Sequence, residues 1–291
     1  MKKTWGLSLI SFGMLLLTFA FFWFLWAGKD LIDYDDIQSV QSLSFNQNFS
    51  EVNNITIYGG LADTITLTMA QQTQITANIT GHIEAIVAKR ESRDFIIGSP
   101  NNGVSLTSCP WFKKCPPISR LVSIEVIIPY DFKGNIYIYG VAPAIGVSSP
   151  RLSDNIQYLA INTADSAIDI TNISSDIFIN TAKLDLSCTH TANKISVNST
   201  SANIIYQPGE NTSMELNISS GYVEMSIQHM PVTGVRIEST GINTTLIENQ
   251  TETRYFASQT FDYEYDSSDH KIDISINALY ATIQVDKKIT P

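Results

Sequence analysis

The chain has 291 residues, of which 44% are apolar and 16% are charged, so it can bury a sizeable core. Its formal net charge of −10 argues against a nucleic-acid-binding protein, which needs a basic surface to displace counterions from phosphates. We therefore expect no nucleic-acid partner. Three cysteines in a chain of this length exclude a disulfide-dense scaffold.

Residues 5–27 form an uncharged apolar stretch long enough to predict one membrane-spanning helix that acts as a signal anchor. Lys2 and Lys3 precede this stretch and favour a cytoplasmic N-terminus, and Trp23 and Trp26 near its far end suit the headgroup region. The alternative is a cleaved signal peptide, which needs a shorter apolar region and small residues before the cleavage site. Either alternative places the following residues outside the cytoplasm. We expect a single-pass cell-membrane protein with an extracellular C-terminal domain.

The rest of the chain shows period-2 alternation of Ile, Val, Thr and Tyr, interrupted by Gly, Asn, Asp and Ser. This pattern is typical of strands and turns, so it predicts an all-β domain. The expected segments are a cytoplasmic tail over 1–4, a stalk over 28–45 and a β domain over 46–291. Within that domain we expect an N-terminal part over 46–140, regular repeats over 155–250 and a C-terminal cap over 251–291.

The repeats give the clearest prediction of architecture. Five similar segments begin at Ile161, Ile179, Val197, Leu216 and Ile237, at spacings of 18, 18, 19 and 21 residues. Each unit has two short apolar strands joined by a polar turn, and a period near 20 indicates a single-stacked β-solenoid, a β-helix-like fold. The alternative is an antiparallel sandwich, which would not be expected to hold such an even spacing.

The repeat motifs resemble those of the bacterial putative adhesin family, a domain of unknown function built as a β-solenoid from I-x-T-x-S-G-x-I-x-I units. The matching residues are Ile161–Thr163 with Ile168–Ile170, Asn217–Gly221 with Val223 and Met225, and the preceding strand Val126–Pro129. This chain departs from the family pattern because only two of its five turns carry glycine, at Gly221 and Gly241. The resemblance covers about residues 45–285 and implies a cell-envelope surface module.

Two closely spaced cysteines, Cys109 and Cys115, can close a small disulfide loop in an oxidising exterior. One interpretation is a structural clip on a long hairpin. The other is a contact loop, because exposed aromatic side chains beside cations are typical of binding tips. The side chains that such a loop would display are Trp111, Phe112, Lys113 and Lys114.

The sequence predicts no catalytic, metal-binding or cofactor-binding motif. Cys188 shares the parity of Leu184 and Leu186, which predicts a buried free thiol, and His190 is poorly placed on the same strand to activate it. The four histidines lack ligand spacing. The acidic residues of 262–269 do not match a calcium loop and are expected to be solvated. Nine N-x-S/T sequons are interpreted mainly as turn and outward strand residues, at Asn48, Asn54, Asn78, Asn172, Asn198, Asn211, Asn217, Asn243 and Asn249.

These features favour a non-enzymatic, membrane-anchored surface protein, an adhesin or an envelope-sensing module that binds a protein, a glycan or a wall polymer. One alternative is a polysaccharide-acting enzyme, for which Asp169 and Asp185 have outward parity. A second alternative is a structural scaffold whose chains stack end to end.

Overall fold

The computed structural model describes residues 40–83, 85–98, 121–141, 143–153, 155–190, 192–207, 214–229, 233–248 and 250–287. The chain divides into two compact units, and nearly all of these residues belong to the unit formed by residues 41–107 and 118–291. The expected membrane span and most of the stalk lie outside the described residues. Within the described ranges, no helix is long and apolar enough to cross a bilayer.

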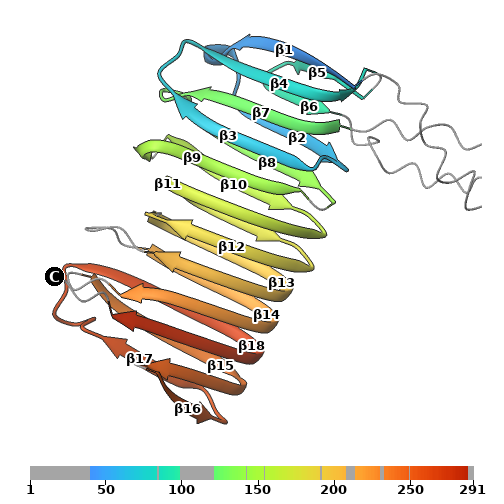
Figure 1. The fold of residues 1–291 in the computed structure, drawn as a ribbon. Helices are drawn as coiled ribbons and strands as arrows, with labels where there is room; N and C mark the ends of the chain where they lie inside the picture. Colours follow the sequence, from blue (N-terminus) through green and yellow to red (C-terminus); the bar gives the residue numbers. More distant parts are fainter. Residues whose placement is uncertain are drawn as a thin grey trace, which may run out of the picture. The chain divides into compact units, whose positions relative to one another are not determined.

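The described unit is all-β, as the alternating pattern predicted, and its strands form two layers (Figure 1). Layer A contains β2 (Asn54–Gly60), β5 (Ala88–Glu91), β6 (Asp94–Gly98), β8 (Gly134–Gly140), β10 (Ile156–Asn162) and β17 (Gln259–Tyr263). Layer B contains β1 (Val40–Asn48), β3 (Thr64–Ala70), β4 (Gln74–His82), β7 (Leu121–Pro129), β9 (Ala144–Ser153), β12 (Lys183–Thr189) and β16 (Thr251–Tyr255). A short 3-10 helix, η1 (Phe49–Glu51), follows β1.

Five long strands bend and contribute to both layers, which is why hydrogen bonding joins all the described strands into one continuous sheet. In β11 the bend coincides with Asn172, whose φ of 56° places it in the left-handed region that asparagine tolerates. The long strands are β11 (Asp165–Asn180), β13 (Ala192–Gln207), β14 (Met214–His229), β15 (Thr233–Glu248) and β18 (His270–Lys287).

Parallel pairing aligns the repeated segments. Ile161 pairs with Ile179, and Ile179 pairs with Val197, so the 18-residue spacing between these segments is the register of the sheet. The predicted alignment is wrong after Val197, which pairs with Ile218 and not with Leu216. Because side chains alternate with period two, this two-residue shift keeps the same residues on the inner face.

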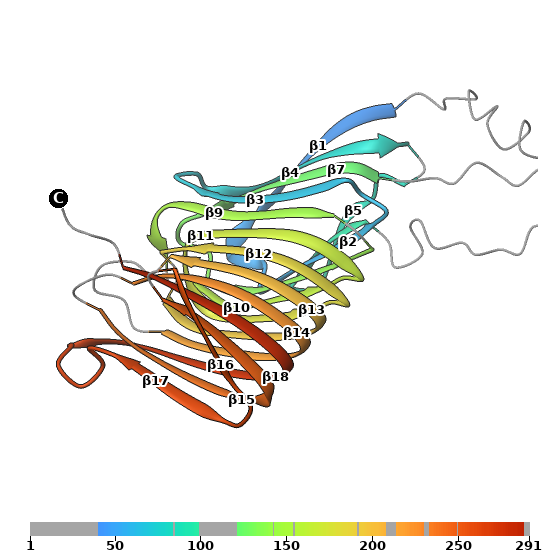
Figure 2. The same cartoon turned by 60° about the horizontal axis from the view of Figure 1, so that its bottom comes forward.

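The inward side chains of both layers form one hydrophobic cluster, so the core lies between the layers (Figure 2). Ile179, Ile218 and Ile274 are at most 2% exposed, and Tyr206 and Phe132 are the largest fully buried side chains. Outward residues alternate with them along each strand, which leaves the outer face of each layer free to carry other functions.

Two turn glycines are required by close backbone approach. A Cβ at Gly241 would lie 2.0 Å from the carbonyl oxygen of Ala278, and one at Gly221 would lie 2.9 Å from the carbonyl oxygen of Thr200. A real Cβ tolerates neither distance. At these two positions glycine therefore allows the backbones of adjacent strands to approach closely.

Antiparallel strands replace parallel ones at both ends of the stack. At one end β4 pairs with β7 and β5 pairs with β6 in antiparallel orientation. At the other end β16 and β17 both pair with β15 in antiparallel orientation. A change of strand direction at an edge interrupts the pattern that a further parallel strand would extend, so it discourages end-to-end pairing.

The C-terminal strand does not follow the order of the chain. β18 lies between β14 and β15 and pairs with both in parallel, so that Ile274 is opposite Leu216 on one side and Ile237 on the other (Figure 1). The sequence predicts a cap over residues 251–291. In the structure β16 and β17 occupy the end of the stack, whereas β18 is an interior strand.

Replacing Ile274 with alanine tests the interior position of β18. The side chain is 1% exposed, so its loss leaves a cavity against neighbours on both sides, and we expect Ile274→Ala to lower the free energy of unfolding by about 2–5 kcal/mol. Urea denaturation followed by circular dichroism measures this change.

The matched control is Ser275→Ala on the same strand, whose side chain is exposed on the outer face. We expect it to change the free energy of unfolding by less than about 0.5 kcal/mol. Equal effects of the two substitutions would contradict the interior placement of β18.

Candidate binding surfaces

Five outward aromatic side chains gather on the outer face of layer A. They come from four adjacent strands, β2, β8, β10 and β11. The rings of Tyr58 and Tyr139 stack with their centroids 5.3 Å apart and an interplanar angle of 17°. The ring centroids of Tyr137 and Tyr158 are 6.1 Å apart. We call this group the aromatic patch, and it consists of Tyr58, Tyr137, Tyr139, Tyr158 and Phe178.

Strand pairing explains why these rings meet. Tyr58 is opposite Tyr139 across β2 and β8, and Ala160 of β10 lies in register between Tyr137 and Phe178. Adjacent strands are about 4.8 Å apart, so outward side chains in register form columns along the stack. Burial raises the pKa of Tyr158, and neighbouring Tyr137 and Asp176 raise it further.

The column that begins with Tyr58 and Tyr139 continues as three asparagines. Tyr139 is opposite Asn162, and the pairing then runs through Asn180 to Asn198. We call Asn162, Asn180 and Asn198 the amide column. Within the described ranges the side-chain amides of these three residues form no hydrogen bond, so their donors and acceptors are available to a ligand.

The same outer face is hollowed from Asn198, the last residue of the amide column, onward. A depression of about 380 Å³ lies over β13, β14, β18 and β15. Its lining is polar apart from Val197, Ile218 and Ile276 and includes Asn198, Asn217, Ser219, Asn277 and Thr240. The aromatic patch and this depression therefore lie next to one another along one face.

The neighbouring outward column carries charges that are already paired. The Lys194 Nζ lies 2.8 Å from Glu215 Oε1, and this hydrogen bond is the main cause that lowers the pKa of Glu215. The Arg236 Nε lies 2.8 Å from Asp262 Oδ1, and its guanidinium stacks 4.0 Å from the centroid of Tyr265. Both cations of this column are thus engaged by carboxylates.

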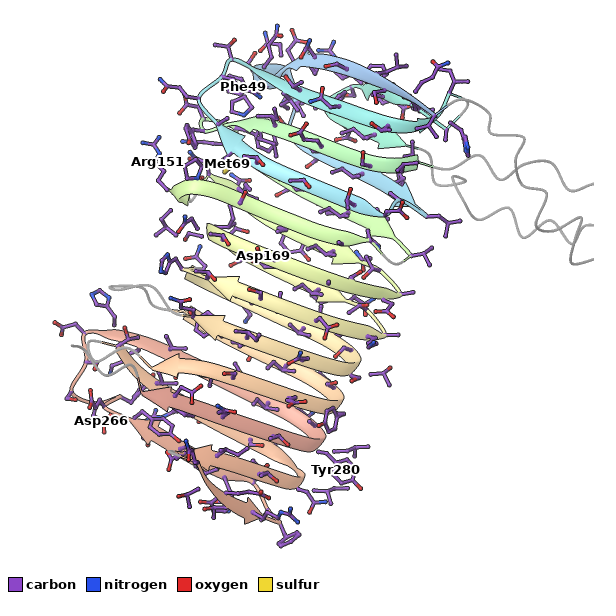
Figure 3. All side chains as sticks on the ribbon, in the orientation of Figure 1. Phe49, Met69, Arg151, Asp169, Asp266 and Tyr280 are labelled. Atoms are coloured by element: carbon purple, nitrogen blue, oxygen red, sulfur yellow. The ribbon has the colours of Figure 1, made fainter. Side chains whose placement is uncertain are left out.

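A second depression, of about 510 Å³, lies on the outer face of layer B. Small residues, Ala144, Gly146 and Ala167, form its floor, and Asp169 and Asp185 line it. Figure 3 shows Asp169 near the middle of this face. We call this depression the layer B groove.

The two carboxylates of the groove lie on adjacent strands but not opposite each other. Asp169 of β11 is opposite Ser187, and Asp185 of β12 is opposite Ala167. Asp185 accepts a hydrogen bond from the Asn203 amide at 3.4 Å. Both side chains are exposed, whereas a general acid requires surroundings that keep a carboxyl protonated near neutral pH.

The acidic residues of 262–269 lie in and after β17. Asp262 and Asp266 both face Arg236, at 2.8 Å and 3.9 Å. Among the described residues, no group of three or more His, Cys, Asp or Glu side chains is arranged to hold a metal ion.

Cys188 is a free thiol and is 2% exposed, which confirms the predicted burial. Burial raises the pKa of this thiol, and the nearby Asp169 carboxylate raises it further. His190 lies in an exposed turn with φ of 52°. The thiol therefore has the properties of a small core side chain and not of a nucleophile.

The predicted disulfide and contact loop lie outside the described residues. This holds for Cys109, Cys115, Trp111, Phe112, Lys113 and Lys114, and also for the span-flanking residues Lys2, Lys3, Trp23 and Trp26. Their roles stay predictions.

Sequence reasoning missed the aromatic patch. The alternation of residues 135–140 predicts a strand with Tyr137 and Tyr139 on one face, but it does not predict which other aromatic residues join them. Tyr58 and Phe178 come from distant parts of the chain, and only the register of the sheet brings them to the same surface.

No protein-family model and no curated protein matches the chain. Among solved structures it is similar to a putative cell adhesion protein from Clostridium sporogenes, with 12% identity and a TM-score of 0.39 over 86% of this chain and 100% of that chain. It is similar to a putative adhesin from Bacteroides fragilis, with 13% identity and a TM-score of 0.37 over 85% and 98%. A putative adhesin from Parabacteroides distasonis gives 8% identity and a TM-score of 0.39 over 84% and 97%.

The burial of Cys188 predicts a slow reaction with thiol reagents. At pH 8 we expect iodoacetamide to leave Cys188 unmodified in the folded chain, because the thiol is inaccessible and its raised pKa keeps it protonated. Mass spectrometry of the peptide that contains Cys188 measures this reaction. Addition of urea should restore rapid alkylation, and equal rates with and without urea would contradict the burial.

Proposed function

We propose that the chain is a membrane-anchored cell-surface protein whose outer domain is a β-solenoid that functions by binding, as an adhesin or an envelope-sensing module. The observation that carries this proposal is the gathering of five outward aromatic residues on four adjacent strands of layer A. Four of these side chains are half-buried and Tyr139 is exposed, and aromatic side chains gathered on the surface of a rigid sheet are typical of recognition surfaces.

The solenoid assignment is supported by the parallel pairing of successive strands in matched register. In such a fold each turn of the chain contacts only its neighbours, so one continuous hydrophobic column stabilises the stack. The apolar residues 5–27 and the preceding Lys2 and Lys3 support an anchor with the solenoid outside the membrane.

The anchored topology predicts that the outer domain is cut by protease in intact cells. The protein carries an epitope tag at its C-terminus and is expressed in cells that are then treated with protease. We expect loss of the tag from whole cells, while the untreated protein pellets with the membrane fraction.

A cytoplasmic protein serves as the control for cell integrity and must stay intact. Protection of the tag until the membrane is broken would overturn the extracellular assignment. Recovery of the untreated protein in the culture medium would overturn the anchor and favour a cleaved signal peptide.

The layer B groove favours a second candidate function, a polysaccharide-acting enzyme, because it holds Asp169 and Asp185 in one depression. Release of reducing sugar from neutral polysaccharides tests it. Under the binding proposal we expect no release by the natural protein, and activity abolished in Asp169→Asn and Asp185→Asn would favour the enzyme.

A further inference from the structure

We propose that the outer face of layer A is a binding track for a neutral, extended polysaccharide, an inference that rests on the proposed binding function. The track has two parts in register. The aromatic patch forms the first part, and the amide column with the adjoining depression forms the second.

The aromatic patch has the chemistry that recognises sugar rings. One face of a pyranose is apolar because its C–H groups point the same way, and it packs against an aromatic ring. The rings of Tyr58 and Tyr139 stack on each other, with centroids 5.3 Å apart and planes at 17°, so together they offer a sugar their edges and the two outer ring faces. Tyr139 is 37% exposed, whereas the other four aromatic side chains of the patch are half-buried, so Tyr139 is the ring most accessible to a ligand. Stacking of this kind contributes binding free energy in addition to that gained from burying the area of the rings.

The amide column supplies polar side chains that the described residues do not use, whereas in the depression the Asn217 amide already donates to Glu215 Oε1 at 2.6 Å. The amides of Asn162, Asn180 and Asn198 form no hydrogen bond within the described part of the chain. Each amide offers two donors and an acceptor, which match the hydroxyl groups of a sugar. By contrast, Asn54 and Asn135 on the same face are engaged, since the Asn135 amide donates to Asn54 Oδ1 at 3.0 Å.

The charges of the face exclude an anionic polymer. Its outward side chains include Asp176, Glu215, Glu238 and Asp273. The cations Lys194 and Arg236 are held by carboxylates at 2.8 Å, and Lys271 lies over the Tyr265 ring at 4.7 Å. An anionic chain would have to displace these ion pairs and approach a protein with a net charge of −10. A neutral ligand meets no such barrier.

The regular spacing of outward side chains on this face favours a polymer over a folded protein as the ligand. Tyr58, Tyr139, Asn162, Asn180 and Asn198 occupy consecutive positions of one column, so their spacing is the strand spacing of about 4.8 Å. This step is similar to the length of one pyranose unit in an extended chain. A ligand with its own regular repeat can use several of these positions at once, whereas a folded protein partner presents an irregular surface.

Binding of the full-length protein to glycans tests the inference. The protein is purified in a detergent without a sugar headgroup and applied to immobilised neutral oligosaccharides, with polygalacturonate as the anionic probe. Isothermal titration then measures affinity for neutral hexasaccharides of β-linked glucose and N-acetylglucosamine. We expect a neutral oligosaccharide to bind more tightly than about 1 mM, and longer chains to bind more tightly than shorter ones.

Matched tyrosine variants locate the site. We expect Tyr137→Ala with Tyr139→Ala to weaken binding at least about tenfold, and Tyr137→Phe with Tyr139→Phe to keep it within about twofold, because the rings remain. Asn180→Ala with Asn198→Ala should weaken binding without removing it. The control is Tyr222→Ala with Tyr280→Ala, which removes two exposed tyrosines paired at a corner away from the patch, where Figure 3 labels Tyr280.

Several outcomes would overturn the inference. They are no binding of any neutral glycan by the natural protein, tighter binding of polygalacturonate, or equal loss in the patch and corner variants. Circular dichroism of each variant ensures that loss of binding is not loss of fold, and a misfolded alanine variant is replaced by Tyr139→Ser alone. Since purified protein is used, a failure here is distinct from a failure of the topology experiment on cells.

Discussion

Parallel backbone pairing, kept in register by matched inward side chains, is the constraint on which the rest of this structure depends. A strand pair of one repeat has too few neighbours to bury its isoleucines alone. Pairing Ile161 with Ile179 and Ile179 with Val197 solves this, because each strand completes the core of the one before it. The same pairing satisfies the backbone hydrogen-bonding groups that would otherwise be exposed along each strand.

That constraint places few demands on which residues occupy the outward positions. Every second side chain points away from the core, so it contributes little to the fold and can be chosen for another purpose. The outer face of layer A shows two such choices in one column, with aromatic residues at Tyr58 and Tyr139 and amides from Asn162 to Asn198. The column keeps these groups at fixed spacing, which loops could not do as accurately.

The sequence predicted the strand content, the inward parity and the 18-residue register, because these depend on local alternation and on spacing along the chain. It did not predict which segments become neighbours when the chain order is broken. Both Leu216 and Val197 precede asparagine, which favours aligning them, yet in the sheet Val197 is opposite Ile218, two residues further along β14. Nothing in residues 270–287 distinguishes an interior strand from a cap, because both alternate in the same way. The aromatic patch was missed for a related reason, since Tyr58 and Phe178 meet only through the pairing of strands far apart in sequence.

The position of β18 has a consequence for biosynthesis. A stack in chain order could grow as the polypeptide emerges, each strand adding to the last. Here one edge of β14 and one edge of β15 remain unpaired until residues 270–287, which follow both strands in the chain, have been synthesised. Contacts between segments so far apart close late and slowly. The far end of the molecule therefore stays incomplete until residues 270–287 have been synthesised, so a chain interrupted before them would keep two open strand edges and be a ready substrate for quality-control proteases.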